Sequence, residues 1–335
     1  MMSEFSLASL SIVDRQLLNL LQSSFPLVRE PFQRLGRELG LSHKDTMERV
    51  RQLRDTGLVR YVSGIFNPDR LGYHRALIAM KIPEHSLPQA VTSLEDHPGV
   101  SHNYGRDNAY NLWFTLNLPS TVPLEDEARG LAATMGAEAM LFLPTMSVFK
   151  IGVYFDMVGD GTQNLRQKRP ASRAVLKTRP ALSDVEMETI RRLQDDLATT
   201  ALPFAETAAS VGMSENEFLS MARTFLSRGV MRRYGAVLRH QQAGFTANAM
   251  GCWAVPQQLL EAVGKFVASF PNVSHCYERL THPDWPYNLF TMIHGHTREE
   301  CQGIAADISN QTGIAKYELL FTTVEYKRSR MRYFA

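Results

Sequence analysis

The stretch Val100-Ser-His-Asn-Tyr-Gly-Arg106 occurs a second time as Val273-Ser-His-Cys-Tyr-Glu-Arg279, 173 residues further along the chain. Other pairs keep the same order at nearly the same separation: Pro31-Phe32 with Pro203-Phe204, Tyr110-Asn-Leu with Tyr287-Asn-Leu, and Thr145 and Lys150 with Thr322 and Lys327. Repetition of this length is the signature of a duplicated unit. The sequence therefore predicts two tandem copies of one fold.

Each copy is predicted to begin with a helix-turn-helix. In copy one, residues 11 to about 60 carry an apolar stripe at helical spacing. Pro31 begins the second helix, Gly40 ends it, Ser42 caps the third and Gly57 stops that one. Copy two repeats the pattern from Leu182 to Gly229, with caps at Ser183 and Ser214.

The rest of each copy alternates strand, helix, strand, strand, helix, strand. The predicted ranges are 75–82, 87–96, 100–106, 110–118, 125–135 and 140–155 in copy one, and 247–255, 257–269, 273–279, 287–294, 298–312 and 316–333 in copy two. This is the ferredoxin-like βαββαβ order, with helices on one face of an antiparallel sheet. The fold class is therefore α+β, each copy a winged helix-turn-helix plus a ferredoxin-like domain. The other face of each sheet is expected to be covered by the matching face of the other copy.

The predicted domain boundaries follow from this plan: helix-turn-helix units at 1–60 and 181–233, ferredoxin-like domains at 61–155 and 234–335, and a basic, Pro- and Gly-containing linker at 156–180.

Composition narrows the class of protein. The chain has 335 residues, 44% hydrophobic and 21% charged, with a net charge of +2. Its three cysteines form no CxxC pair, and no signal peptide or apolar span is present, so we expect a cytoplasmic protein without a membrane partner. The third helices carry little positive charge, +1 over 42–57 and zero over 214–229, which disfavours nucleic acid as a partner.

Of the ten histidines, only His102 and His275 occupy the same position in both copies. Because strand side chains alternate between faces, His102, Tyr104 and Arg106 share one face, as do His275, Tyr277 and Arg279. Such a triplet favours a cavity for an anionic ligand, although a wetted sheet face remains open. His282 lies in a loop that only copy two contains.

Neighbouring residues complete the candidate substrate site. The next strands carry Tyr110, Asn111, Trp113, Tyr287 and Asn288, where an aromatic wall and an ordinary core are equally consistent with the pattern. Lys150 and Lys327 end the last strands, and Arg60, Arg232 and Arg233 stand where the two domain types join. No metal site is predicted, because His294-x-His296 lacks a third ligand nearby.

The helix-turn-helix followed by βαββαβ resembles the Lrp/AsnC regulators. More specifically, His97-Pro-Gly-Val-Ser-His-Asn-Tyr-Gly-Arg106 followed by Tyr110-Asn-Leu-Trp-Phe-Thr115, and the corresponding run from Val273 to Phe290, resemble the siroheme decarboxylases in their fused two-subunit form. The resemblance implies removal of the acetate carboxyls at C12 and C18 of siroheme in heme d1 biosynthesis. It also implies that no separate cofactor is used, since the iron belongs to the substrate, and that related decarboxylase subunits are potential partners.

The resemblance also suggests residue roles. His102 and His275 match the family's motif histidine, whereas the position of a second family histidine holds Asn108 in copy one and is served by His282 in copy two. The copy-two site is therefore expected to be the more competent. His275 or His282 would donate a proton to the new methyl carbon, Arg279 would orient a carboxylate and Tyr277 would hydrogen-bond nearby. Axial ligation of the substrate iron by one histidine remains open.

Two other classes of function stay open. A transcription regulator with a small effector would show tight, sequence-specific DNA binding. A tetrapyrrole sensor or carrier would bind siroheme and leave its mass unchanged.

Overall fold

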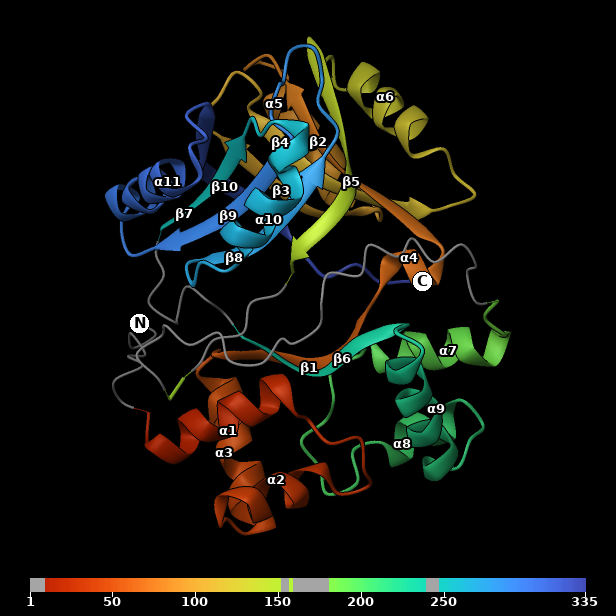
Figure 1. Ribbon diagram of the computed structural model, residues 1–335. Coiled ribbons are helices and arrows are strands. Elements are labelled where there is room, and N and C mark those ends of the chain that lie inside the picture. Colours follow the sequence, from red (N-terminus) through yellow and green to blue (C-terminus); the bar gives the residue numbers. More distant parts are fainter. Residues whose placement is uncertain (1–9, 152–156, 159–180, 239–246) are drawn as a thin grey trace.

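The computed structural model describes residues 10–151, 157–158, 181–238 and 247–335. Two helical units lie on one side of the molecule and a strand-rich body lies on the other, with strands β1 and β6 between them (Figure 1). The C-terminus reaches the space between the helical side and the strand-rich body (Figure 1).

The helix-turn-helix units form at the predicted capping residues. The helices are α1 (Ile12–Ser23), α2 (Pro31–Leu39) and α3 (His43–Asp55) in copy one, and α7 (Asp184–Leu193), α8 (Ala205–Ser210) and α9 (Glu215–Ser227) in copy two. Ser42, Ser183 and Ser214 each accept a backbone N–H in the first turn of the helix that follows. Gly40 ends α2 in the left-handed conformation at φ 68°, which a side chain would strain.

The two helical units are joined by a shared ribbon and a shared core. Strand β1 (Val59–Phe66) of copy one pairs antiparallel with β6 (Met231–Leu238) of copy two. One continuous apolar cluster contains Leu18, Phe32, Phe204 and Phe225 from both copies. The predicted boundaries at 60 and 233 fall inside these two strands, because a pairing between copies leaves no local signal in either stretch. The predicted linker, 156–180, lies outside the described residues except for 157–158.

The ferredoxin-like halves close together into an eight-stranded barrel. Copy one supplies β2 (Tyr73–Lys81), β3 (Val100–Arg106), β4 (Leu112–Pro119) and β5 (Ala139–Lys150); copy two supplies β7 (Ala247–Trp253), β8 (Val273–Arg279), β9 (Leu289–Gly295) and β10 (Tyr317–Arg328). The order around the barrel is β10-β3-β4-β2-β5-β8-β9-β7. The expected covering of each sheet by the other copy is confirmed.

Two long strands close the barrel by belonging to both sheets. The first half of β5 pairs with β2 of its own copy, and its second half pairs with β8 of the other copy. Strand β10 does the same with β7 and β3. A barrel closed in this way exposes no sheet edge.

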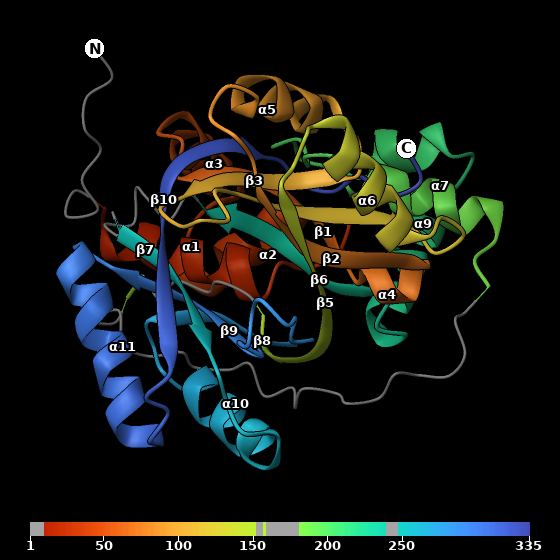
Figure 2. The ribbon, with the colours of Figure 1, turned by 90° about the horizontal axis from the view of Figure 1, so that it is seen from above.

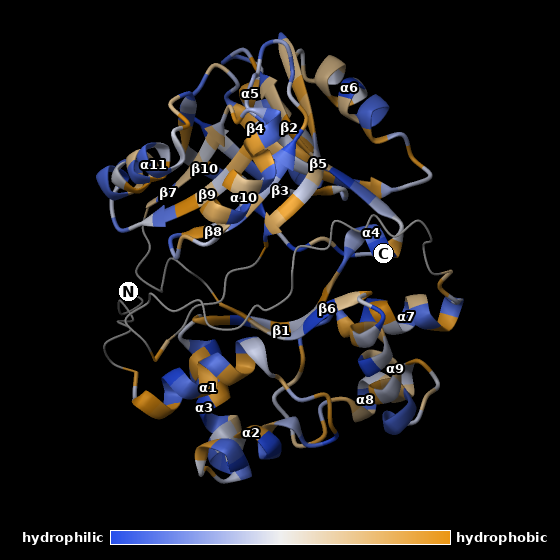
Figure 3. Ribbon diagram, viewed as in Figure 1, coloured by the Kyte–Doolittle hydropathy of each residue, from blue (hydrophilic) through white to orange (hydrophobic). Residues whose placement is uncertain are grey.

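Helices cover the outside of the barrel. Figure 2 shows α5 (Leu87–Asp96) and α6 (Leu124–Thr134) on one side, and α10 (Leu260–Ala268) and α11 (Arg298–Thr312) on the other. These helices pack on outward-facing strand residues such as Phe114 and Cys276. They show both hydrophobic and hydrophilic residues in Figure 3, as helices with one buried face do. The short helices α4 (Pro68–Leu71) and η3 (Gln257–Leu259) complete the described elements. None of the described helices is long and apolar enough to span a bilayer.

Candidate active site

The two histidine-bearing strands lie opposite each other in the barrel, because β3 and β8 are four places apart in its order. Cys276 on β8 faces outward and packs against α10, so its alternate neighbours His275 and Tyr277 face inward. We call His102, Tyr104 and Arg106 the first row, and His275, Tyr277 and Arg279 the second row. The charge of His102 affects the titration of His275, so the two rows share one interior.

Both histidines are neutral at physiological pH. Burial lowers the pKa of His102 to about 4, assisted by the positive charges of Arg328 and Arg60. Burial lowers the pKa of His275 to about 3, assisted by His294, His102, Arg75 and Lys150. The rows are thus only partly exposed, which favours a cavity over the wetted sheet face left open by the sequence.

Each histidine bonds through Nδ1 to the serine that precedes it. In the first row, Ser101 Oγ lies 3.0 Å from His102 Nδ1 and accepts from Asn117 Nδ2 at 3.2 Å. In the second row, Ser274 Oγ lies 2.8 Å from His275 Nδ1 and 2.6 Å from His294 Nε2. The two series of hydrogen bonds differ in their third residue, which is the amide of Asn117 in the first row and the imidazole of His294 in the second.

The arginines of the rows lie under the tyrosines. The Arg106 guanidinium lies 5.3 Å from the Tyr104 ring centre, and that of Arg279 lies 5.3 Å from the Tyr277 ring centre. Arg106 donates to Leu320 O and Thr322 Oγ1, and Arg279 donates to Leu143 O and Thr145 Oγ1, so each holds the bend of the strand shared between the sheets. Neither Nε has a hydrogen-bond partner among the described residues.

Further arginines surround each row. Arg75 and Arg232 act electrostatically on Tyr277, as Arg60 and Arg328 do on Tyr104. Within the described ranges, Arg75, Arg232 and Arg279 form no salt bridge. Several buried cations without carboxylate partners repel one another and are costly to desolvate, so they favour a ligand that brings negative charge.

Burial also affects the arginines and the phenols. Burial lowers the pKa of Arg279 to about 10 and lowers that of Arg232, and it raises the pKa of Tyr104 and Tyr277. The phenols therefore remain neutral hydrogen-bond donors and the guanidiniums remain cations at neutral pH.

The structure removes Asn111 and Asn288 from the predicted substrate-binding set. Each amide exchanges two hydrogen bonds with the backbone of one residue, Asn111 with Ile82 and Asn288 with Val255. These bonds tie the start of one strand to the end of its neighbour and use the oxygen and one N–H of each amide.

Two lysines and one arginine are also occupied elsewhere. Lys327 donates to Leu94 O, Glu95 O and His97 O at the end of α5, and Lys150 donates to Phe270 O beyond α10. Arg233 donates to Gln22 O and Ala236 O in the helical unit. These three cations, predicted to bind substrate, thus donate to backbone carbonyl groups, although Lys150 also acts electrostatically on His275.

The aromatic residues form the apolar half of the barrel interior. Trp113 is fully buried with Met250, Cys252 and Leu320, and Tyr110 and Tyr287 pack on Trp285. The structure thus favours the interpretation of these aromatics as ordinary core. This apolar cluster and the polar rows share the barrel interior.

His282 does not join the second row. Its side chain is 37% exposed on the loop after β8, where it pairs with Asp284, and its backbone bridges to Trp285. It follows Arg279 by three residues, while His275 precedes Arg279 by four along an extended strand, so the two rings stand well apart.

Three residues at the rows were not predicted from the sequence: Arg75, Arg328 and His294. The repeat aligns His294 with Asn117, so its imidazole has no counterpart in copy one. Arg75 shares the inward face of β2 with Leu77 and Ala79, and a charged residue in that alternation was the available signal.

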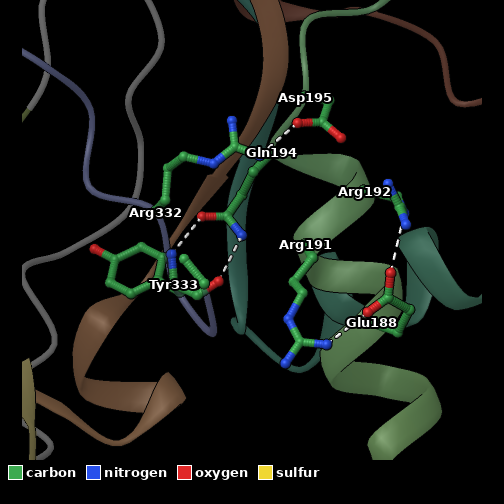
Figure 4. Close-up of a pocket in the computed structure, with 8 residues that line it drawn as sticks. Glu188, Arg191, Arg192, Gln194, Asp195, Arg332 and Tyr333 are labelled. Carbon is green, nitrogen blue, oxygen red and sulfur yellow. Dashed lines mark hydrogen bonds and ion pairs between the residues drawn. The ribbon is translucent and has the colours of Figure 1, made fainter. Parts of the chain in front are cut away.

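A separate hollow of about 250 Å³ lies between α7 and the C-terminal residues. Figure 4 shows it lined by Arg191, Arg192 and Glu188 with Arg332 and Tyr333, and most of these groups already bond one another. It is smaller than the usual range for organic ligands and carries no histidine of the rows.

The cations of the third helices are used inside the molecule. Arg54 forms a bidentate pair with Asp196, Arg51 donates to Thr199 O, and Arg223 donates to Leu27 O, each across the two copies. Arg228 pairs with Glu186. These side chains fasten the helical units together, which leaves few cations for DNA phosphates.

Comparison with known proteins gives matches along nearly the whole chain. Residues 70–150 and 242–327 match the AsnC-like ligand binding domain, and 14–60 and 186–232 match the siroheme decarboxylase NirDL-like HTH domain. A siroheme decarboxylase of Hydrogenobacter thermophilus is 38% identical over 96% of this chain and 94% of its own length. A siroheme decarboxylase beta subunit of Methanosarcina barkeri is 41% identical, covering 45% of this chain and 99% of that subunit.

A solved structure has the same arrangement. The crystal structure of the siroheme decarboxylase NirDL superposes with a TM-score of 0.78 and 34% identity, over 97% of this chain and 95% of that one. A second structure of NirDL, in complex with an iron-uroporphyrin III analogue, superposes with a TM-score of 0.77.

Proposed function

Since the chain belongs to the siroheme decarboxylase family, we propose that it removes acetate carboxyl groups from siroheme, as a carboxy-lyase, at the second row of the barrel interior. The observation that carries this proposal is the pair of buried histidine–tyrosine rows, the second of which lies beside Arg75, Arg232 and Arg279, three cations that form no salt bridge among the described residues. The C12 and C18 acetates and a place in heme d1 biosynthesis belong to the proposal as expectations from the family.

The chemistry of siroheme suits this interior. Its macrocycle is flat and apolar, and acetate and propionate groups project from its rim. The cations Arg75 and Arg232, beside the second row, would pair with rim carboxylates. The apolar cluster around Trp113 and Phe290 supplies apolar surface in the same interior. A polyanion would also relieve the repulsion among the buried guanidiniums.

The reaction needs a proton at the carbon that loses carbon dioxide. The C–COO⁻ bond breaks, its electron pair stays on the ring-attached carbon and spreads into the macrocycle, and a proton converts that carbon into a methyl group. The electron sink is part of the substrate, so the proposal includes no separate cofactor. His275 donates the proton from Nε2, because its Nδ1 is held by Ser274. Tyr277 remains a neutral phenol and donates a hydrogen bond to a neighbouring carboxylate.

Incubation of the purified chain with siroheme without oxygen tests this function, with the product mass as the readout. Loss of two carboxyl groups as carbon dioxide is the expected result. Binding without a change of mass would instead indicate a carrier or sensor. Sequence-specific DNA binding at physiological salt, without turnover, would favour a regulator.

Partners follow from the same proposal. Because separate alpha and beta subunits of related decarboxylases each match about half of this chain, we infer that one chain here supplies what two subunits supply there. Siroheme and its decarboxylated product are the proposed ligands, in a cytoplasmic setting.

A further inference from the structure

The two rows differ in the group that reaches the serine behind the histidine. In the first row that group is the Asn117 amide, which donates to Ser101 Oγ. In the second row it is His294, whose Nε2 lies 2.6 Å from Ser274 Oγ. Strand β9 places His294 where β4 places Asn117, so the difference is a substitution within one conserved geometry of the duplicated fold.

The consequence concerns how a neutral histidine can act as an acid. Burial keeps His275 unprotonated at neutral pH, so it holds a single ring proton. If Nε2 gives that proton to substrate, the ring is left as an unstable anion unless Nδ1 gains a proton in the same step. The Ser274 hydroxyl stands 2.8 Å from Nδ1 and is positioned to supply it.

We propose that Ser274 and His294 form a proton path that recharges His275 and makes the second row the site of turnover. This inference rests on the proposed function. As the His275 Nε2–H bond breaks and the new C–H bond forms, Ser274 passes its hydroxyl proton to His275 Nδ1. His294, as imidazolium, passes a proton from Nε2 to Ser274 Oγ and becomes neutral. Solvent restores the proton on His294, so the net reaction consumes one proton and releases one carbon dioxide.

The first row lacks the last member of this path. An amide donates a hydrogen bond but does not release a proton at neutral pH, so Asn117 holds the Ser101 hydroxyl toward His102 without recharging it. We therefore expect the first row to bind carboxylates and to turn over slowly.

The charged and titratable groups around His275 determine which of them can affect the pH dependence of kcat. The charged or titratable groups acting on it are His294 from β9, His102 from β3, Arg75 from β2 and Lys150 from β5. Burial lowers the pKa of His102 to about 4, so its charge does not change over the neutral range. Because the path takes its proton from His294, which lies 2.6 Å from Ser274 Oγ, the proposal assigns to His294 the limb at which kcat falls as pH rises.

The test removes the last member of the path. His294→Asn gives the second row the arrangement of the first, and Asn310→Ala, on the exposed face of α11, is the control. We expect His294→Asn to lower kcat about 100-fold, the scale of lost acid catalysis, and to remove the limb at which kcat falls as pH rises. Siroheme affinity, measured by absorbance titration, should stay within about twofold, because neither side chain is in the arginine set. Asn310→Ala should leave kcat and affinity intact.

Folding is checked in the same experiment by the siroheme titration. If His294→Asn does not bind siroheme, His294→Gln replaces it, because its longer amide also reaches a hydroxyl but releases no proton. A siroheme-binding variant that keeps the wild-type kcat and pH profile overturns the proton path. Wild-type protein that fails to decarboxylate siroheme overturns the proposed function instead, so the two failures are distinguishable.

Discussion

At the scale of single residues, the site combines polar and charged groups whose burial would each be unfavourable alone. Neutral imidazoles, neutral phenols and desolvated guanidiniums share one interior, and the polar groups behind them are joined to Ser101 and Ser274. Binding of an anion there would replace repulsion between cations with ion pairs.

The buried histidines predict how stability depends on pH. Their folded pKa values of about 4 and about 3 lie below the ordinary value of 6.5, so the unfolded chain binds more protons between those limits. The free energy of unfolding should therefore be constant above about pH 6.5 on their account and fall as pH drops below it. The fall amounts to about 1.4 kcal/mol per pH unit for each histidine.

Urea unfolding of the wild type and of His102→Gln/His275→Gln between neutral and acid pH measures this dependence. The double variant should lose less stability over the same interval. Parallel curves for the two proteins would show that the histidines are not buried in the neutral form.

Turnover should separate the same two histidines. His275→Gln is expected to lower kcat by about 100-fold or more, because the donor that contacts the carbon is gone, whereas His102→Gln should change kcat by no more than a few fold. Steady-state product formation by mass, at saturating siroheme, makes the comparison. Equal losses in both variants would contradict the assignment of turnover to the second row.

At the scale of elements, the sequence predicted what local chemistry determines. Ser42, Gly40 and Pro31 mark helix ends through their own backbone preferences, and the alternation around His102 identified a strand face. The pairing of β5 with β8 could not be predicted, because a ladder to the other copy depends on barrel closure and not on residues 145–150. For the same reason the sequence predicts the lysines at the ends of β5 and β10 to be ligand groups, whereas in the structure they donate to carbonyl groups near the ends of α10 and α5.

The amide ties between strands give an element-scale prediction. Asn288→Ala removes both hydrogen bonds to Val255 and leaves a buried N–H and C=O without partners. We expect the free energy of unfolding to fall by about 2 kcal/mol or more. Asn310→Ala, on the exposed face of α11, serves as the control and should change it by less than about 0.5 kcal/mol. An unchanged urea midpoint in Asn288→Ala would return this residue to the ligand-binding set.

At the scale of the whole molecule, duplication builds a pseudo-dimer in which neither half is complete. Three strand ladders cross between the copies: β1 with β6, β5 with β8, and β10 with β3. Fusion also allows the two rows to diverge, since each is encoded once. Asn117 and His294 are the most direct sign of that divergence, because equal subunits in a symmetric dimer would carry the same residue twice.

The crossing ladders predict that covalent continuity is dispensable after folding. A protease site introduced within residues 159–180 interrupts none of the three ladders, so the cut protein should remain one particle and keep its siroheme turnover.

Copy one produced alone, as residues 1–158, should leave the second half of β5 and the free side of β3 without their partners and should self-associate or aggregate. Size-exclusion chromatography with light scattering, before and after cleavage, gives the mass in solution. Separation of the cut halves under native conditions would mean that the ladders between copies are too weak to hold the barrel closed, and turnover by copy one alone would remove the need for His275 and its path.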